Sequence, residues 1–165
     1  MPNPGLSFDA FFEDHYDRVR RVLSVALGDP VAAEEAAQEA FTRALMQWRK
    51  VSVMDRPAGW VYVVAVRHGW RQRSRAHVEI GDVRSPDLAD GVVAQATLAE
   101  LLATLPERQR TAVTLRYLAD LSLIEVADAM GCAVGTVKST LHAALQRLRV
   151  AARGSDEGAE SDAAR

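Results

Sequence analysis

The stretch from Leu121 to Arg149 limits most strongly how this chain can fold. Ser122 and Glu125 have the S-x-x-E spacing of a capping box, which predicts a helix that begins at Leu123. Gly131 is a natural end for that helix, because glycine adopts a left-handed conformation without steric cost. A second helix is expected after a short turn. Its apolar residues recur at helical spacing and are Val137, Leu141, Ala144, Leu145 and Leu148.

Short, mostly polar side chains occupy the opposite face of this second helix, since successive residues are rotated by about 100°. The face consists of Thr136, Ser139, Ala143 and Gln146, flanked by Lys138, His142 and Arg149 on one side and by Thr140 and Arg147 on the other. A major groove admits a helix only if short side chains let it approach the base edges. The stretch therefore predicts a DNA-binding helix-turn-helix, with an ordinary helical hairpin as the alternative.

Composition narrows the class of protein further. Aromatic residues make up only 6% of the 165 residues, so alanine, valine and leucine must fill the core. No apolar run is long enough to span a bilayer and no signal-peptide pattern precedes the first helix, so we expect a cytoplasmic protein. Cys132 is the only cysteine, which rules out an internal disulfide and a multi-cysteine zinc site. We expect no metal and no cofactor.

Enzymatic activity is not predicted. The chain has no Walker-type phosphate loop, no G-x-G-x-x-G after a strand and no H-E-x-x-H zinc motif. Its four histidines are dispersed along the sequence and none is paired with a nucleophile.

The net charge of −2 conceals two basic blocks. Residues 51–77 carry five bases against one acid, and residues 101–153 carry seven bases against four acids. Residues 78–100 between them carry five acids and one base. Local patches of charge, rather than the total, decide whether phosphates are attracted, so the balance is compatible with nucleic-acid binding.

The pattern along the chain predicts an all-α fold with two small helical domains joined by a flexible linker. Ser7 and Asp29–Pro30 are start signals for two helices, residues 49–56 read as a loop, and Pro57 opens a third helix that runs to about Arg75. The expected divisions are a first domain at 7–76, an acidic linker at 77–96, a second domain at 97–152 and a disordered tail at 153–165.

A basic stripe marks the third helix, because Arg67, Arg71 and Arg75 recur every four residues. Trp60 lies at the helix start, and the preceding segment carries the bases Arg49, Lys50 and Arg56. Arginines beside aromatic rings suit single-stranded or melted DNA, where bases can stack on the rings. A solvated basic face with a packed tryptophan explains the same residues equally well.

The second helix presents acids and amides at Glu34, Glu35, Gln38 and Glu39. A surface for docking another protein is one interpretation. An i, i+4 pair between Glu39 and Arg43 is a simpler explanation for part of the pattern. Periodicity alone does not choose between the two.

Three segments together resemble RNA polymerase sigma factors of the extracytoplasmic-function group in the sigma-70 superfamily. AAEEAAQEAFTRALMQW (32–48) is similar to the segment that docks on the β′ clamp helices of the polymerase. RPAGWVYVVAVRHGWRQRSR (56–75) is similar to the segment that melts and reads the minus-ten element. The residues from LPERQRTAV to LQRLR (105–149) are similar to the domain that reads the minus-thirty-five element.

The resemblance implies a role for each matching residue. Polymerase docking is implied for Glu34, Glu35, Gln38, Glu39 and Trp48. Contacts with the minus-ten element, including capture of a flipped base, are implied for Arg49, Lys50, Arg56, Trp60, Arg67, Arg71 and Arg75. Contacts with the minus-thirty-five element and its phosphates are implied for Thr136, Lys138, Ser139, Thr140, His142 and Arg147.

The implied partners are core RNA polymerase, through its β′ clamp helices and β flap, and promoter DNA. An anti-sigma factor is a further candidate partner, although no residue of the chain identifies one. The chain departs from the family where Thr140 stands in place of a usual arginine and where Ala143 and Ala144 replace more basic residues. Because this helix lacks an obvious arginine for bidentate contact with guanine, we expect weak discrimination at the minus-thirty-five element.

Two other functions fit parts of the pattern. A stand-alone helix-turn-helix regulator would bind an operator without polymerase, usually as a dimer on symmetric half-sites. A small helical protein whose basic faces meet acidic proteins would show no salt-sensitive affinity for DNA.

Overall fold

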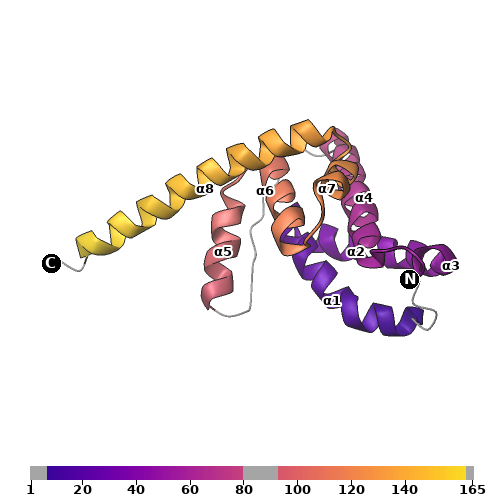
Figure 1. Ribbon diagram of the computed structural model, residues 1–165. Coiled ribbons are helices and arrows are strands. Elements are labelled where there is room, and N and C mark those ends of the chain that lie inside the picture. Colours follow the sequence, from indigo (N-terminus) through magenta and orange to yellow (C-terminus); the bar gives the residue numbers. More distant parts are fainter. Residues whose placement is uncertain (1–6, 80–92, 163–165) are drawn as a thin grey trace.

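The structure, a computed structural model, describes residues 7–79 and 93–162, with side chains described for 7–75 and 98–153. Within those ranges the chain is helical and contains no strand (Figure 1). The elements in chain order are α1 (Phe8–Leu27), α2 (Pro30–Met46), α3 (Trp48–Val51), α4 (Pro57–Glu79), α5 (Val93–Ala103), α6 (Glu107–Val113), the short π-helix η1 (Thr114–Leu118), α7 (Leu123–Met130) and α8 (Val134–Asp162). The predicted all-α class is confirmed.

The predicted helix starts in the first half are confirmed by their caps. The Ser7 hydroxyl accepts a hydrogen bond from the Ala10 amide at 3.2 Å, and Gly28 ends α1 in the left-handed region with φ of 65°. The Asp29 carboxylate accepts from the first amides of α2, with Pro30 at the first helical position. These caps satisfy amides that the helix itself leaves unpaired, which fixes where each helix begins.

The core of the first half lies between α1, α2 and α4. Phe11, Leu23 and Phe41 are its largest side chains and are almost fully buried, surrounded by alanines of α2 and valines of α4. Gly69 in the middle of α4 has a packing role, since a Cβ there would lie 2.8 Å from Leu27 of α1. The glycine costs helix propensity but allows α1 and α4 to approach closely.

The helix-turn-helix forms as the sequence predicts. Both hydrogen bonds of the capping box are present, from the Glu125 amide to the Ser122 hydroxyl and from the Ser122 amide to the Glu125 carboxylate. Gly131 ends α7 with φ of 61°. Val137, Leu141 and Ala144 of α8 are buried against the other helices of the second half.

Three predicted boundaries differ from the structure. Residues 49–56 are not wholly a loop, because Trp48–Val51 form α3, anchored by buried Val51. The tail was predicted as disordered from 153, whereas α8 continues to Asp162; no proline interrupts the helix in this segment. α4 continues to Glu79, and residues 80–92 of the predicted linker lie outside the described residues.

The two halves pack against each other, which the sequence pattern did not indicate. The Thr111 hydroxyl of α6, fully buried, donates to the Ala26 carbonyl of α1 at 3.0 Å. The Arg110 guanidinium donates to the Ala26 and Leu27 carbonyls at 3.4 and 3.3 Å. Two residues of α6 therefore donate hydrogen bonds to carbonyls that α1 leaves unpaired at its C-terminal end. Buried residues of both halves form one continuous core. Figure 1 shows α7 beside α4, and α8 running away from this contact toward the C-terminus.

Candidate nucleic-acid and protein interfaces

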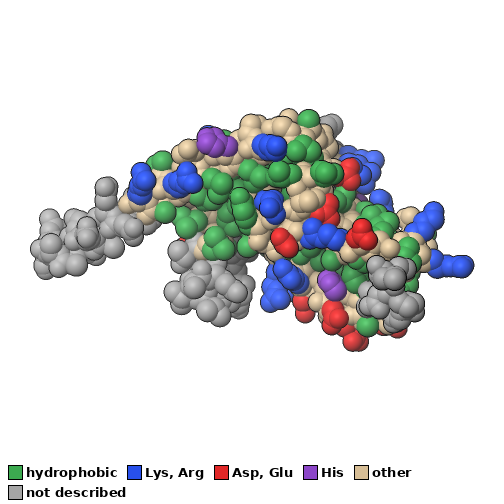
Figure 2. Space-filling model, in the orientation of Figure 1, with side chains coloured by type: hydrophobic (Ala, Val, Ile, Leu, Met, Phe, Trp, Pro, Cys, Tyr) green, Lys and Arg blue, Asp and Glu red, His purple; other side chains and the backbone are tan. Residues whose placement is uncertain are grey.

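The outer face of α8 is available to a ligand along its first four turns. Thr136, Lys138, Ser139, His142 and Arg147 are exposed and Thr140 is half-buried. Figure 2 shows basic side chains and a histidine spaced along the upper edge of the molecule, over α8. The side chains nearest the start of α8 are short, so a nucleic-acid groove meets little steric hindrance there. All six residues predicted for this helix thus lie on one accessible element.

A shallow depression of about 460 Å³ lies beside this face. It is lined by Pro106 to Gln109 at the start of α6 and by Ser139, Thr140 and Ala143 of α8. The small side chains at 139, 140 and 143 leave this space open. A phosphate backbone following α8 would therefore pass close to Arg108, which is exposed.

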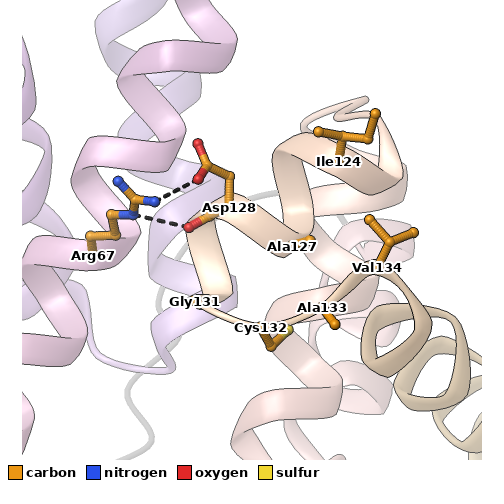
Figure 3. Close-up of a pocket in the computed structure, with 8 residues that line it drawn as sticks. All are labelled: Arg67, Ile124, Ala127, Asp128, Gly131, Cys132, Ala133 and Val134. Atoms are coloured by element: carbon orange, nitrogen blue, oxygen red, sulfur yellow. Dashed lines mark hydrogen bonds and ion pairs between the residues drawn. The ribbon is translucent and has the colours of Figure 1, made fainter.

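The basic stripe on α4 is only partly free. Arg71 and Arg75 are exposed, whereas Arg67 is bound to α7 of the second half. Its Nε donates to the Asp128 carbonyl at 2.9 Å, and its Nη2 lies 2.6 Å from the Asp128 carboxylate (Figure 3). Sequence reasoning identified the stripe correctly but missed the residue that covers one end of it.

Arg56 is held in the same way. Its Nη1 lies 2.8 Å from the Glu125 carboxylate and its Nη2 donates to the Asp120 carbonyl at 2.5 Å. Arg49 and Lys50 of α3 remain exposed, and Trp60 is half-buried against the core. Of the seven residues predicted for melted DNA, Arg56 and Arg67 are therefore engaged by the second half of the chain.

A signal for these contacts was present in the sequence. Asp128 lies in the last turn of α7, where the helix dipole disfavours a carboxylate. A partner cation offsets that unfavourable position, but periodicity gave no means of locating the cation on α4. Asp120 has φ of 54°, uncommon for a residue other than glycine.

The acidic face of α2 divides into two kinds of residue. Glu34 accepts hydrogen bonds from the Tyr16 hydroxyl at 2.6 Å and the Gln38 amide at 3.0 Å, and Arg20 lies 3.6 Å away. Glu39 pairs with Arg43 at 2.6 Å, as the simpler interpretation expected. Glu35 and Gln38 are exposed. Glu34 therefore joins α2 to α1, and Glu35 is the carboxylate most available to a partner.

Trp48 lies at the end of this face in an aromatic cluster. The centroid of its ring lies 5.4 Å from that of Phe8, in an edge-on arrangement, and 5.0 Å from that of Phe11. Phe11, Phe12 and Tyr16 also contact Phe41. The cluster fixes α1, α2 and α3 relative to one another, so Trp48 acts as a half-buried anchor of the face.

The Tyr16–Glu34 contact perturbs both groups. The hydrogen bond from Tyr16 holds the pKa of Glu34 below its ordinary value, and burial together with Glu34 raises the pKa of Tyr16 to about 12. Because the folded carboxyl pKa is lowered, its stabilisation is present above the unfolded value of 4.5 and is lost as pH falls through the folded value.

We expect Tyr16→Phe to raise the pKa of Glu34 toward its ordinary value and to reduce the fall in unfolding free energy below about pH 5. Near neutral pH, Tyr16→Phe should lower the free energy of unfolding by about 0.5 kcal/mol. This figure is discounted for solvent screening, because the carboxylate is partly exposed. Carboxyl-detected NMR titration measures the pKa of Glu34, and urea unfolding at several pH values measures the free energy of unfolding. Tyr62→Phe is the control, because the buried Tyr62 hydroxyl has no hydrogen-bond partner among the described residues. An unchanged Glu34 pKa in Tyr16→Phe would contradict the assignment.

In the ranges 7–75 and 98–153, no three histidine, cysteine or acidic side chains come close enough to hold a metal ion. No helix in the same ranges combines the length and apolarity needed to cross a membrane.

Comparison with known proteins identifies the two halves separately. Residues 11–76 match the family Sigma-70 region 2, and residues 95–148 match Sigma-70, region 4. The RNA polymerase sigma-E factor of Streptomyces avermitilis is 31% identical over 150 residues, covering 87% of this chain and 84% of that protein. The ECF RNA polymerase sigma factor SigW of Bacillus subtilis is 29% identical, covering 86% of this chain and 88% of that protein.

Solved structures agree on the fold. The sigma factor RpoE of Bartonella quintana, solved in complex with the anti-sigma factor NepR, is similar with a TM-score of 0.71 at 20% identity, covering 86% of this chain and 94% of that one. CnrH, solved with the cytosolic domain of CnrY, is similar with a TM-score of 0.56 at 18% identity, covering 89% and 88% of the two chains. The chain belongs to the extracytoplasmic-function group of the sigma-70 family of RNA polymerase sigma factors.

Proposed function

We propose that this chain binds core RNA polymerase and directs it to promoters, with no catalytic activity of its own. The observation that carries the proposal is the presence of two exposed surfaces on one chain, one polar and one basic. One is the exposed polar face of α8, and the other is the basic stripe of α4 with α3 beside it. Their order along the chain is that of sigma regions 2 and 4.

The stripe on α4 and the bases of α3 suit the minus-ten element. Arg71, Arg75, Arg49 and Lys50 are exposed and can follow a backbone, and Arg56 and Arg67 join them when released from α7. Trp60 is half-buried beside them, placed to support an unstacked base. Capture of a base outside the duplex costs a few kcal/mol, which these phosphate contacts offset.

The face of α8 suits the minus-thirty-five element. Thr136, Ser139, Thr140 and His142 can approach base edges, and Lys138 and Arg147 can bind phosphates. The small number of bases on this helix supports modest affinity for that element. Contacts of the second half with the β flap would then help to hold it on the promoter.

The acidic face of α2 suits the β′ clamp helices. Glu35 and Gln38 are exposed, Glu39 lies beside them with Arg43, and Glu34 and Trp48 hold the face in position. An anti-sigma factor is a further proposed partner, supported by two similar structures that were solved with such partners or with a cytosolic partner domain.

A regulator that acts without polymerase is not favoured. It would leave the acidic face of α2 without a role, and it would require a dimer to read symmetric half-sites. Family membership extends over both halves of the chain, including the half that lacks the helix-turn-helix.

Glu35→Lys is expected to weaken binding to core polymerase by about tenfold or more, because it reverses the charge of the most exposed carboxylate on the proposed docking face. Co-purification and a titration with labelled chain measure the change. Glu13→Lys on α1 carries the same change of charge at an exposed position outside the face and should bind normally. Wild-type chain that neither binds core polymerase nor supports runoff transcription would refute the proposed function.

A further inference from the structure

One side of the outer face of α8 carries a row of methyl groups. Thr136, Thr140 and Ala143 recur at i, i+4 and i+7, so they follow one another along the same side of the helix. Each residue bears one methyl group, and these three residues are called the methyl row below. Thr136 is exposed, and Thr140 and Ala143 are half-buried. Arg147, one turn beyond Ala143, ends the row with a cation.

The other side of the outer face is basic. Lys138, His142 and Arg149 are exposed there, and the uncharged Ser139 and Gln146 separate them from the methyl row. Figure 2 shows the charged side chains over α8 with uncharged surface between them. Cations on this side suit backbone phosphates, which position a protein on DNA but carry no sequence information directly. The methyl row is therefore the part of the face that is left to contact base edges.

Open space beside the row lets a base pair come close. The depression of about 460 Å³ between α6 and α8 is lined on the α8 side by Ser139, Thr140 and Ala143. Arginine at position 140 or 143 would fill this space and hold the backbone of α8 further from a base pair. Apolar contact requires carbon atoms within about 4.5 Å of each other. Short side chains at these positions meet that requirement only if the helix lies deep in the groove.

The Ser139 hydroxyl has a defined hydrogen-bonding role beside the row. It donates to the Thr136 carbonyl at 3.0 Å, so its hydrogen is engaged and its oxygen lone pairs remain to accept. In the major groove the base donors are the amino groups of adenine and cytosine, whereas guanine and the thymine carbonyl present acceptors. Ser139 therefore suits an adenine or a cytosine.

Thymine is the base that presents a methyl group in the major groove, and alanine and threonine methyl groups make apolar contact with it. Thr136 and Ala143 are seven residues apart, which is about 10 Å along the helix axis. This distance corresponds to about three base-pair steps of about 3.4 Å each. The methyl row thus matches thymines on up to three adjacent base pairs, and an adenine paired with thymine also satisfies Ser139.

We propose that the methyl row reads the 5-methyl groups of thymines in the minus-thirty-five element. The inference rests on the proposed function, in which α8 enters the major groove of that element. Thr136, Thr140 and Ala143 contact the methyl groups, and Ser139 accepts a hydrogen bond from an adenine amino group. Burial of methyl groups then supplies the discrimination that a bidentate arginine would otherwise give, and Arg147 binds a phosphate beyond the row.

The first test replaces thymine by deoxyuridine, which lacks the 5-methyl group but keeps O4 and pairing with adenine. The probe is a duplex that carries a promoter mapped by runoff transcription on genomic DNA, and fluorescence anisotropy measures its binding by reconstituted holoenzyme. We expect affinity to fall about fourfold for each contacted methyl group, the value for burying one methylene-sized group. Deoxyuridines outside both promoter elements are the control and should change nothing. An unchanged affinity after every thymine of the minus-thirty-five element is replaced, or an element without thymine, would overturn the inference.

The second test removes the methyl group from the protein. Thr136→Ser and Thr140→Ser each delete one methyl group and keep the hydroxyl. Each variant should bind the thymine duplex about fourfold more weakly than wild type. The loss should disappear on the deoxyuridine duplex, because the partner methyl group is already absent there. Thr104→Ser, at an exposed position just after α5, makes the same change away from α8 and should bind both duplexes normally. An equal loss on both duplexes in both variants would overturn the inference.

Runoff transcription from the unsubstituted template separates this inference from the proposed function. Wild-type holoenzyme that transcribes, yet binds thymine and deoxyuridine duplexes equally, would leave the function standing and refute methyl reading. Wild-type holoenzyme that does not transcribe from any template would refute the proposed function, and the inference with it. Transcription together with weaker binding of the deoxyuridine duplex is the expected result.

Discussion

Alanine in place of Phe41 is expected to lower the free energy of unfolding by about 3–5 kcal/mol, the range measured for large-to-small changes at buried aromatic residues. Phe41 is 1% exposed and its ring contacts Phe11, Phe12 and Tyr16 of α1. Removing it leaves a cavity between α1 and α2. Because a domain of this kind is stable by only about 5–15 kcal/mol, the variant should lose much of its stability.

Urea unfolding followed by far-ultraviolet circular dichroism measures this loss. Phe41→Leu is the matched control and should cost less than about 1.5 kcal/mol, because it retains most of the apolar volume. The alanine variant should also bind core polymerase more weakly, since the aromatic cluster holds Trp48 and the acidic face of α2 in place. A cost below about 1 kcal/mol would show that the cluster does not anchor these helices.

The local elements could be predicted because their signals are local. The capping box at Ser122, the left-handed glycine at 131 and the cap at Asp29 depend on hydrogen bonds within four residues of sequence. The outer face of α8 followed from helical periodicity alone, which is why its six candidate residues lie together. The short helix α3 was missed because four residues are too few to show a period.

The contact between the halves could not be predicted in this way. It depends on pairs far apart in sequence, such as Arg56 with Glu125 and Arg67 with Asp128. Only Asp128, at an unfavourable helix end, differs in the sequence from an ordinary surface charge. Periodicity places Arg67 on the correct face of α4 but carries no information about what covers that face. The same limit applies to Glu34, which has the sequence pattern of a docking residue but accepts a hydrogen bond from Tyr16.

Gly69 illustrates an intermediate case. Sequence shows a glycine inside a helix, which costs about 1 kcal/mol relative to alanine. Only the structure shows the compensation, since Leu27 packs where a Cβ would stand. A glycine at an unfavourable position therefore indicates close packing without identifying the partner.

The largest functional effect is expected on α8. Lys138→Glu with Arg147→Glu should weaken holoenzyme binding to promoter DNA by about 100-fold. The promoter for this measurement is first mapped by runoff transcription on genomic DNA. Both side chains are exposed and flank the polar face. They are two of only three bases between residues 134 and 149, with Arg149 the third. Reversing both leaves a helix with little attraction for phosphates.

Salt dependence separates loss of phosphate contacts from misfolding. If Lys138 and Arg147 each bind one phosphate, the slope of log affinity against log salt should fall by about two in the double variant and by about one in each single variant. Arg21→Glu on α1 makes an equal single change of charge away from α8 and should leave the slope unchanged.

An equal loss on a template with a scrambled minus-thirty-five element would mean that α8 attracts DNA without reading it. Because Thr136, Ser139 and Thr140 offer short hydroxyl side chains rather than an arginine, we expect the remaining discrimination between templates to be small but measurable.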